Sequence, residues 1–301
     1  MVRMHAGEIE VDEALVLRLL AAQFPAWAKW PLTRIGAVGT DHAIFRLGDN
    51  LAVRLPRIHW AADNAARERR WLAVLAPRLP LAVPLPVAGG EPDLGYPYPW
   101  SVVRWLDGQT MTADNLRDPL RAAEDLGRFV VALQRVDATG GPSPTSPTAR
   151  GMPLAGRDAD VRRAIAALGP RVDAAAVIAA WEASRGAPAW DGPPVWLHGD
   201  LLPGNLLFRD GRLSGVIDWG GSLAVGDPAA DLIPAWALFR GASRRIFREI
   251  IGADDTTWAR GRGWALSIAL IALPYYLHTF PAFAAIARRM LREALAEQAA
   301  G

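Results

Sequence analysis

Residues 195–221, with the sequence VWLHGDLLPGNLLFRDGRLSGVIDWGG, constrain the fold more than any other part of the chain. The pattern is that of a strand, a turn and a strand, and it is apolar for most of its length. It nevertheless contains two carboxylates, an amide and an imidazole, which belong to Asp200, Asp218, Asn205 and His198. The fold therefore has to build an apolar hairpin that carries polar side chains.

Length and composition limit the classes of protein to which the chain can belong. With 301 residues, of which 51% are hydrophobic, it can bury a sizeable core in one large or two modest domains. It contains no cysteine, which excludes disulfides, thiolate metal sites and a catalytic thiol. The 33 basic and 31 acidic residues are interspersed, so no nucleic-acid partner is expected. Lys29 is the single lysine, and the other basic residues are arginines.

Two segments resemble export or membrane signals but lack the pattern that these require. The opening residues carry acids where a secretory signal needs an uninterrupted apolar run, so we expect a cytoplasmic protein. Residues 264–287 are long and almost uncharged, but Pro274, His278 and Pro281 interrupt them. We expect a pair of buried helices there and no membrane partner.

The first part of the chain has the periodicity of strands. After an opening helix, residues 32–57 alternate between apolar and polar around the turn residues 48–50, which predicts three antiparallel strands. A helix over 61–76 and a buried strand over 98–108 follow. We therefore expect a small strand-rich domain over 1–105.

The second part of the chain is mainly helical. A helix is predicted over 121–136, and residues 137–158 are rich in the Gly, Pro, Ser and Thr of surface loops. Apart from 195–221, the remaining residues have helical patterns. The predicted architecture is an α+β fold in which a larger helical domain, over 106–301, follows the small antiparallel sheet.

The polar residues of 195–221 have the spacing of a phosphoryl-transfer site. Asp200 and Asn205 form D-x-x-x-x-N, the spacing of a base and a magnesium ligand in protein-kinase catalytic loops, and Asp218 follows in VIDWG. Phosphoryl transfer requires a carboxylate that orients the attacking hydroxyl, and hard oxygen ligands for Mg²⁺. Each residue alone has an alternative interpretation as ordinary turn chemistry, but the combination favours the site. His198 is expected to brace the loop.

These motifs resemble those of the aminoglycoside phosphotransferase family, kinase-fold enzymes that modify small molecules, many of them antibiotics. The similar segments are HGDLLPGNLL, VIDWG and GDPAADL, and the resemblance extends from about residue 34 to 240. It implies a bilobal protein-kinase-like fold with an antiparallel-sheet N-lobe and a helical C-lobe. It further implies that Asp200 is the base, that Asn205 and Asp218 bind Mg²⁺, and that Asp231 braces the catalytic loop.

The nucleotide-binding residues are expected in the first domain. Gly39 lies at the tip of the first hairpin, and the backbone amides of Gly39, Thr40, Asp41 and His42 can cover phosphates. The alternative is a plain hairpin turn, because a phosphate loop usually has more than one glycine. By family spacing, the backbone of Arg104, Trp105 and Leu106 forms the hinge that binds the purine of ATP or GTP.

The third strand carries arginine where the family has the lysine that contacts the α- and β-phosphates. Arg54 occupies this position, and Glu68 lies on the apolar face of the following helix, three, four and seven residues before Trp71, Leu72 and Leu75. A carboxylate on that face needs a partner, which predicts an Arg54–Glu68 pair. The alternative is that Glu68 is a rim residue with surface partners.

The acceptor is less constrained than the nucleotide. Residues 232–301 contain five acids against nine arginines, whereas a polycationic aminoglycoside calls for carboxylates. We expect an O-phosphotransferase that moves the γ-phosphoryl of ATP or GTP to a hydroxyl of a small molecule, foremost an antibiotic of aminoglycoside or macrolide type. Alternatives are a kinase of a metabolite alcohol, a catalytically weak nucleotide-binding or scaffold protein, and a metal-dependent hydrolase. The sequence does not define the oligomeric state.

Overall fold

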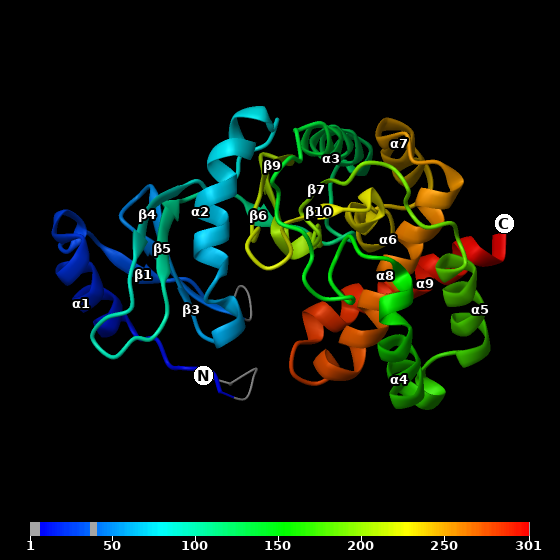
Figure 1. Cartoon of the computed structure of the whole chain (residues 1–301), viewed down its shortest axis with the longest axis horizontal. Coiled ribbons are helices and arrows are strands. Elements are labelled where there is room, and N and C mark those ends of the chain that lie inside the picture. The colour runs from blue at the N-terminus through cyan, green and yellow to red at the C-terminus, as the bar shows by residue number, and fades with distance from the viewer. Residues whose placement is uncertain (1–6, 37–40, 301) are drawn as a thin grey trace. The chain divides into compact units, whose positions relative to one another are not determined.

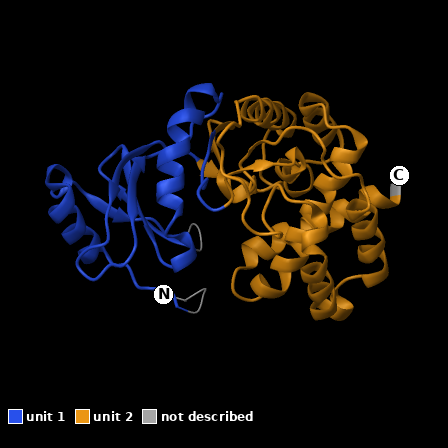
Figure 2. Cartoon of the chain, in the orientation of Figure 1, with its two compact units in different colours: residues 1–108, 215–221 blue, residues 109–214, 222–301 orange. Residues whose placement is uncertain are grey.

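The computed structural model describes residues 7–36 and 41–300 and divides into two compact units (Figures 1 and 2). Unit 1 comprises residues 1–108 and 215–221, and unit 2 comprises 109–214 and 222–301. The units are therefore not continuous halves of the chain. The segment 215–221, which contains the VIDWG motif, belongs with the strand-rich unit.

Unit 1 contains a five-stranded antiparallel sheet in the order β1-β2-β3-β5-β4, counted over the residues that the structure describes. The strands are β1 (Leu32–Arg34), β2 (His42–Leu47), β3 (Leu51–Pro56), β4 (Pro86–Gly90) and β5 (Trp100–Arg104). The three predicted antiparallel strands are confirmed as β1 to β3. Leu47 pairs with Leu51 across the predicted turn, where Gly48 has a φ of +57° that favours glycine.

Two helices complete unit 1, α1 (Glu13–Gln23) and α2 (Asn64–Leu75), with short 3-10 helices at Pro25–Trp27, His59–Ala61 and Ala76–Arg78. Asp12 caps α1 by accepting a hydrogen bond from the amide of Leu15 at 2.7 Å. Val16, Leu19 and Leu20 share one face of α1, and they pack into the core formed by the sheet residues, Phe45 and Val53 among them. This core fixes the sheet on which the candidate nucleotide residues lie.

Unit 2 contains the larger set of helices (Figure 1). The helices are α3 (Pro119–Gln134), α4 (Asp158–Leu168), α5 (Ala174–Arg185), α6 (Pro234–Ala237), α7 (Gly241–Ile251), α8 (Asp255–Tyr276) and α9 (Pro281–Ala300). Short 3-10 helices lie at Leu154–Arg157, Gly169–Arg171, Pro203–Asn205 and Pro228–Leu232. The predicted helix pair is present as α8 and α9, which pack together. Within the described ranges, no helix has the length and apolar character needed to cross a membrane.

The strands of the 195–221 segment do not pair as predicted. β7 (Val195–Leu197) pairs with β10 (Ala224–Gly226), whereas β8 (Leu206–Arg209) and β9 (Arg212–Val216) form a hairpin that β6 (Gln109–Thr110) extends. The interpretation of one hairpin with Asp200 and Asn205 in its turn was therefore wrong. The hairpin turn is Asp210-Gly211, with φ values of +52° and +80°, and the polar loop connects two separate sheets.

Candidate functional site

A buried carboxylate organises the start of the candidate catalytic loop, residues 198–205, in unit 2. Directly after β7, the amides of His198 and Gly199 donate hydrogen bonds to the two carboxylate oxygens of Asp231, at 2.9 and 2.6 Å. Asp231 is fully buried on the 3-10 helix Pro228–Leu232. Burial raises the pKa of Asp231 to about 7, against the opposing effect of the two backbone N–H groups. The brace that the resemblance implied for Asp231 thus corresponds to a two-point contact with the backbone.

Asp200 and Asn205 face each other across the same loop. The side-chain amide of Asn205 donates to the backbone carbonyl of Asp200 at 2.8 Å and to its Oδ2 at 2.9 Å. The backbone N–H of Asp200 donates to Nδ1 of the buried His198 at 3.2 Å. Because the Asn205 nitrogen faces Asp200, its Oδ1 is the atom left to coordinate a cation. The side chain of Asp200 is 28% exposed and so remains accessible.

Arg54 and Glu68 form a buried ion pair in unit 1, as the sequence predicts. Arg54 Nη1 donates to Glu68 Oε2 at 2.6 Å, and Arg54 Nη2 lies 3.4 Å from Asp218 Oδ1. Burial acts to lower the pKa of Arg54, but the carboxylates of Glu68 and Asp218 raise it above its ordinary value. Glu68 is 1% exposed, so the alternative of a surface rim residue is wrong.

Glu68 also connects α2 to the VIDWG segment within the same unit. Its Oε1 accepts a hydrogen bond from the amide of Gly220 at 2.8 Å, and Arg67 donates to the carbonyl of Gly220 at 2.6 Å. A Cβ at position 220 would lie 2.4 Å from the Cβ of Asn64, so only glycine fits this approach. The peptide at Gly220 is therefore fixed on both sides, two residues after Asp218.

Asp218 adopts an unusual backbone conformation. Its φ is +64°, in the left-handed region that non-glycine residues rarely occupy, although aspartate tolerates it better than most. Its side chain is 46% exposed, and one oxygen faces Arg54. Such local strain persists where the surroundings fix the conformation, and it is common at functional sites. Asp218 thus presents a carboxylate beside a buried cation.

The predicted phosphate loop is only partly within the described residues. Gly39 and Thr40 lie outside them. The backbone carbonyl of Asp41 accepts a hydrogen bond from the amide of Arg57 at 2.7 Å, and His42 is the first residue of β2. Burial and the nearby charge of Arg54 hold the pKa of His42 well below its ordinary value, so its imidazole is neutral at pH 7.

The predicted hinge offers one backbone amide for a purine. The amide of Arg104 donates to the carbonyl of Leu85, and the amide of Trp105 donates to the carbonyl of Asn50, both at 2.8 Å. Of the three predicted hinge amides, that of Leu106 alone has no backbone acceptor in the part of the chain that the structure describes. A purine contact through an N–H of this segment would therefore fall to Leu106.

Sequence reasoning missed Arg150, which contacts the catalytic loop. Its Nε donates to the carbonyl of Gly199 at 2.9 Å, and its Nη2 lies 3.8 Å from Asp200 Oδ1. Burial lowers the pKa of Arg150, and the charges of Asp200 and Asp231 oppose this effect. An isolated arginine in a loop rich in glycine and proline carries no sequence signal for such a role.

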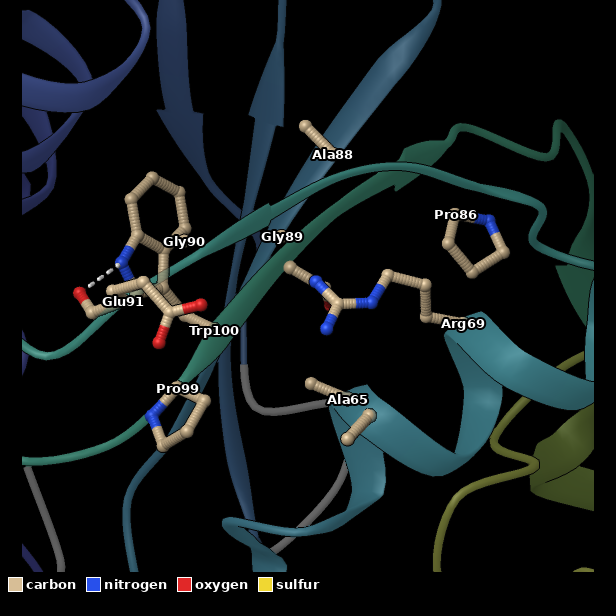
Figure 3. A pocket seen from close by; sticks show the side chains of 11 residues that line it. Ala65, Arg69, Pro86, Ala88, Gly89, Gly90, Glu91, Pro99 and Trp100 are labelled. Atoms are coloured by element: carbon tan, nitrogen blue, oxygen red, sulfur yellow. Dashed lines mark hydrogen bonds between the residues drawn. The ribbon is translucent and has the colours of Figure 1, made fainter.

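A small cavity in unit 1 has none of these residues in its lining. It has a volume of about 20 Å³ and lies between α2 and β4, where the side chain of Arg69 lies over Gly89 and the ring of Trp100 lies against Gly90 (Figure 3). This volume holds about one water molecule. It is therefore too small for a nucleotide or for an acceptor.

Each of the two predicted magnesium ligands, one in each unit, offers an oxygen of the kind that Mg²⁺ prefers. Among the described residues, no group of three or more His, Asp or Glu side chains could hold a metal ion by itself. Mg²⁺ usually takes one or two protein carboxylates together with waters and substrate phosphates. Asn205 Oδ1 and the exposed carboxylate of Asp218 are oxygen ligands of this kind.

Comparison with known proteins identifies the family. The sequence profile of the phosphotransferase enzyme family matches residues 32–264, and the chain belongs to this family. A search of curated protein sequences gives no match.

Solved structures of antibiotic kinases share the fold. The GDP and kanamycin complex of APH(2")-IIIa aligns with a TM-score of 0.69 and 21% identity, covering 95% of this chain and 98% of the other. The macrolide 2'-phosphotransferase MphH from Brachybacterium faecium aligns with a TM-score of 0.62 and 26% identity, covering 94% and 98%. The streptomycin–ATP–APH(2")-IIa ternary complex aligns with a TM-score of 0.60 and 16% identity, covering 95% and 98%. The chain is thus a phosphotransferase with the kinase-like fold of these enzymes.

Proposed function

We propose that the chain transfers the γ-phosphoryl group of ATP or GTP, bound with Mg²⁺, to a hydroxyl of a small molecule. The observation that carries this proposal is the geometry around Asp200. Its backbone amide and its carboxylate are held by His198 and Asn205, while the preceding residue is held by Asp231. A carboxylate fixed in this way, and still partly exposed, is suited to orient an acceptor hydroxyl and accept its proton.

In this proposal the two oxygen donors hold the metal, and Arg54 holds the phosphates. Asn205 Oδ1 and Asp218 would coordinate Mg²⁺, which when bound neutralises developing charge on the phosphoryl oxygens. Arg54 has five N–H donors, and its contacts with Glu68 and Asp218 leave others for phosphate oxygens. Its planar fork differs from the ammonium of lysine in geometry but carries the same charge.

We further propose that the acceptor carries few positive charges, as a macrolide does. The acids of α4 and α5 that could attract a polycation are already engaged by arginines. Asp158 accepts hydrogen bonds from Trp181 and Arg162, at 2.8 and 2.9 Å, and Glu182 accepts from Arg162. Asp160 likewise pairs with an arginine of its own helix. An ammonium group that bound to one of these three acids would have to displace such a partner.

The test is magnesium-dependent turnover of ATP and GTP by the purified chain with kanamycin, streptomycin or erythromycin. Mass spectrometry of the acceptor reads the position of the added phosphate. We expect one phosphate on a hydroxyl, and a higher kcat/KM for erythromycin than for either aminoglycoside. Hydrolysis of nucleotide without phosphorylation of any acceptor would favour a hydrolase, and nucleotide binding without turnover would favour a scaffold protein. A higher kcat/KM for kanamycin than for erythromycin would overturn only the proposal that the acceptor carries few positive charges.

A further inference from the structure

The loop between α3 and α4 supplies an arginine to the catalytic loop. Arg150 lies in this loop, and its guanidinium lies 5.5 Å from the ring centre of Trp264 in α8, within cation–π distance. Its side chain is mostly buried. A guanidinium packed against an indole in this way has little freedom to rotate. Its hydrogen-bond donors therefore point in fixed directions.

Gly199, the residue before Asp200, is held on both of its peptide groups. Its N–H donates to Asp231 Oδ1 at 2.6 Å, and its carbonyl accepts from Arg150 Nε at 2.9 Å. Its φ is +77°, and a Cβ here would lie 2.8 Å from the carbonyl of Ser222 and 3.0 Å from the Cβ of Arg150. The close approach to Ser222, together with the positive φ, makes glycine the residue that fits here. The backbone that leads into Asp200 is therefore held by a hydrogen bond on each side of Gly199.

The same guanidinium faces the carboxylate of Asp200. Arg150 Nη2 lies 3.8 Å from Asp200 Oδ1, which is too long for a hydrogen bond but short enough for a charge interaction. The other oxygen, Oδ2, accepts from Asn205 at 2.9 Å. Each oxygen of the carboxylate therefore has its own polar neighbour, which defines the rotation of the side chain.

We propose that Arg150 is a positioning residue for phosphoryl transfer, because it fixes the Gly199 carbonyl and the rotation of the Asp200 carboxylate. This proposal rests on the proposed role of Asp200 as the base. A carboxylate displaced by about 1 Å orients the acceptor hydroxyl poorly, and such displacements reduce rates by up to about 10²-fold. Nucleotide binding does not depend on this contact, so the effect belongs to kcat.

Arg157 provides a matched control in the same unit. Its guanidinium also packs against Trp264, at 5.3 Å, and it too is buried. Its hydrogen bonds, however, go to the carbonyl of Thr148 and the hydroxyl of Ser267, and not to the catalytic loop. Truncation of Arg157 removes the same packing of the loop on α8 without removing the contact with Gly199.

The experiment compares Arg150→Ala, Arg150→Lys, Arg157→Ala and Asp200→Ala in the full chain. Thermal unfolding, the Kd of Mg·ATP by calorimetry, and kcat and KM with erythromycin and kanamycin are measured for each. We expect Arg150→Ala to lower kcat by roughly 10- to 100-fold and to keep the Kd of Mg·ATP within about twofold. Arg150→Lys should retain more activity than Arg150→Ala but less than the wild type, because lysine has no Nε–H for the Gly199 carbonyl. Millimolar guanidinium chloride should restore part of the kcat of Arg150→Ala, but of neither other alanine variant.

The outcomes separate this proposal from the function on which it rests. If the wild type transfers no phosphoryl group to any acceptor, the proposed function fails and the role of Arg150 falls with it. If the wild type is active and Asp200→Ala is not, an unchanged kcat in Arg150→Ala overturns the role of Arg150 alone. The role of Arg150 is also overturned if Arg157→Ala lowers kcat as much as Arg150→Ala does, or if guanidinium restores no activity to Arg150→Ala. If Arg150→Ala does not fold, a wild-type kcat in Arg150→Lys would likewise overturn it.

Discussion

The two candidate clusters are built from different kinds of contact. In unit 2 the candidate catalytic loop is fixed largely through its backbone, because Asp231 accepts hydrogen bonds from the amides of His198 and Gly199. In unit 1 Arg54 is fixed by side-chain charges, those of Glu68 and Asp218. The cluster of unit 2, which we call the backbone-built cluster, depends on the spacing of its residues along the chain. A charge-built cluster depends on complementary partners, so arginine can stand where the family has lysine if the carboxylates match its fork.

The largest effect on turnover is expected from a substitution in the backbone-built cluster of unit 2. Asp200→Ala removes the proposed base, which would orient the acceptor hydroxyl and accept its proton, so it should lower kcat by on the order of 10²–10⁴. The measurement is steady-state turnover with the best acceptor of the antibiotic panel. Turnover close to that of the wild type would show that Asp200 is a turn residue and that the backbone contacts serve only the fold.

In the charge-built cluster of unit 1, substitutions of Arg54 and Glu68 should not have independent effects. Arg54→Ala should raise the KM for nucleotide and reduce kcat/KM by roughly 10²-fold, because phosphate contacts serve both binding and alignment. Glu68→Ala should show a milder form of the same defect, since the arginine remains but is no longer oriented. The double variant should be little worse than Arg54→Ala, and a double-mutant cycle measures this coupling. Additive losses would mean that the ion pair does not position Arg54.

Asp231, in the backbone-built cluster, should make the free energy of unfolding depend on pH. Its pKa is raised to about 7 in the folded protein from the ordinary 3.8, chiefly by burial, with Asp200 raising it further and Arg150 opposing. Between these two pKa values the folded protein retains a proton that the unfolded chain has released. Protonation of Asp231 therefore stabilises the folded protein at low pH, and this stabilisation is lost as the pH rises toward 7. Relative to Asp231→Asn, the wild type should lose on the order of 2 kcal/mol of unfolding free energy between pH 5.5 and 7. Chemical denaturation of both proteins at several pH values measures it.

A stability difference between the two proteins that does not vary with pH would contradict this. It would mean that the hydrogen bonds from His198 and Gly199 outweigh burial, so that Asp231 is ionised throughout.

The smallest effect on turnover is expected at Asp218, the proposed magnesium ligand of unit 1. Asp218→Asn replaces a carboxylate by a neutral amide, which should raise the magnesium concentration needed for half-maximal turnover by roughly tenfold. It also removes one of the two carboxylates that hold Arg54. Titration of Mg²⁺ at saturating nucleotide provides the measurement. An unchanged magnesium requirement would make Asp218 a structural residue of the VIDWG turn.

Local patterns in the sequence were sufficient for much of the fold and the site. The strands β1 to β3 follow from alternation and turn residues, and the proposed phosphoryl-transfer site rests on the spacing of Asp200, Asn205 and Asp218. The Arg54–Glu68 pair also follows from the sequence, because a carboxylate on an apolar helix face needs a buried cation. In each case the information lies within one element or in a fixed spacing.

Contacts between distant segments were not predictable in this way. β7 pairs with β10 and not with β8, because alternation defines a strand but does not choose its partner. β4 was missed because Pro86, Gly89 and Gly90 are poor strand formers. Arg150 meets Gly199 across 49 residues of chain, and its loop has no periodic pattern. Tertiary packing alone brings these groups together.

We propose that the Arg54 cluster binds the nucleotide and that the Asp200 cluster acts on the acceptor. Calorimetric titration of Mg·ATP and Mg·GTP into Arg54→Ala and Asp200→Ala tests this division directly. Asp200→Ala should bind nucleotide within about threefold of the wild-type Kd, whereas Arg54→Ala should bind at least about tenfold more weakly. The opposite order, or equal losses in both variants, would contradict the assignment of separate tasks to the two clusters.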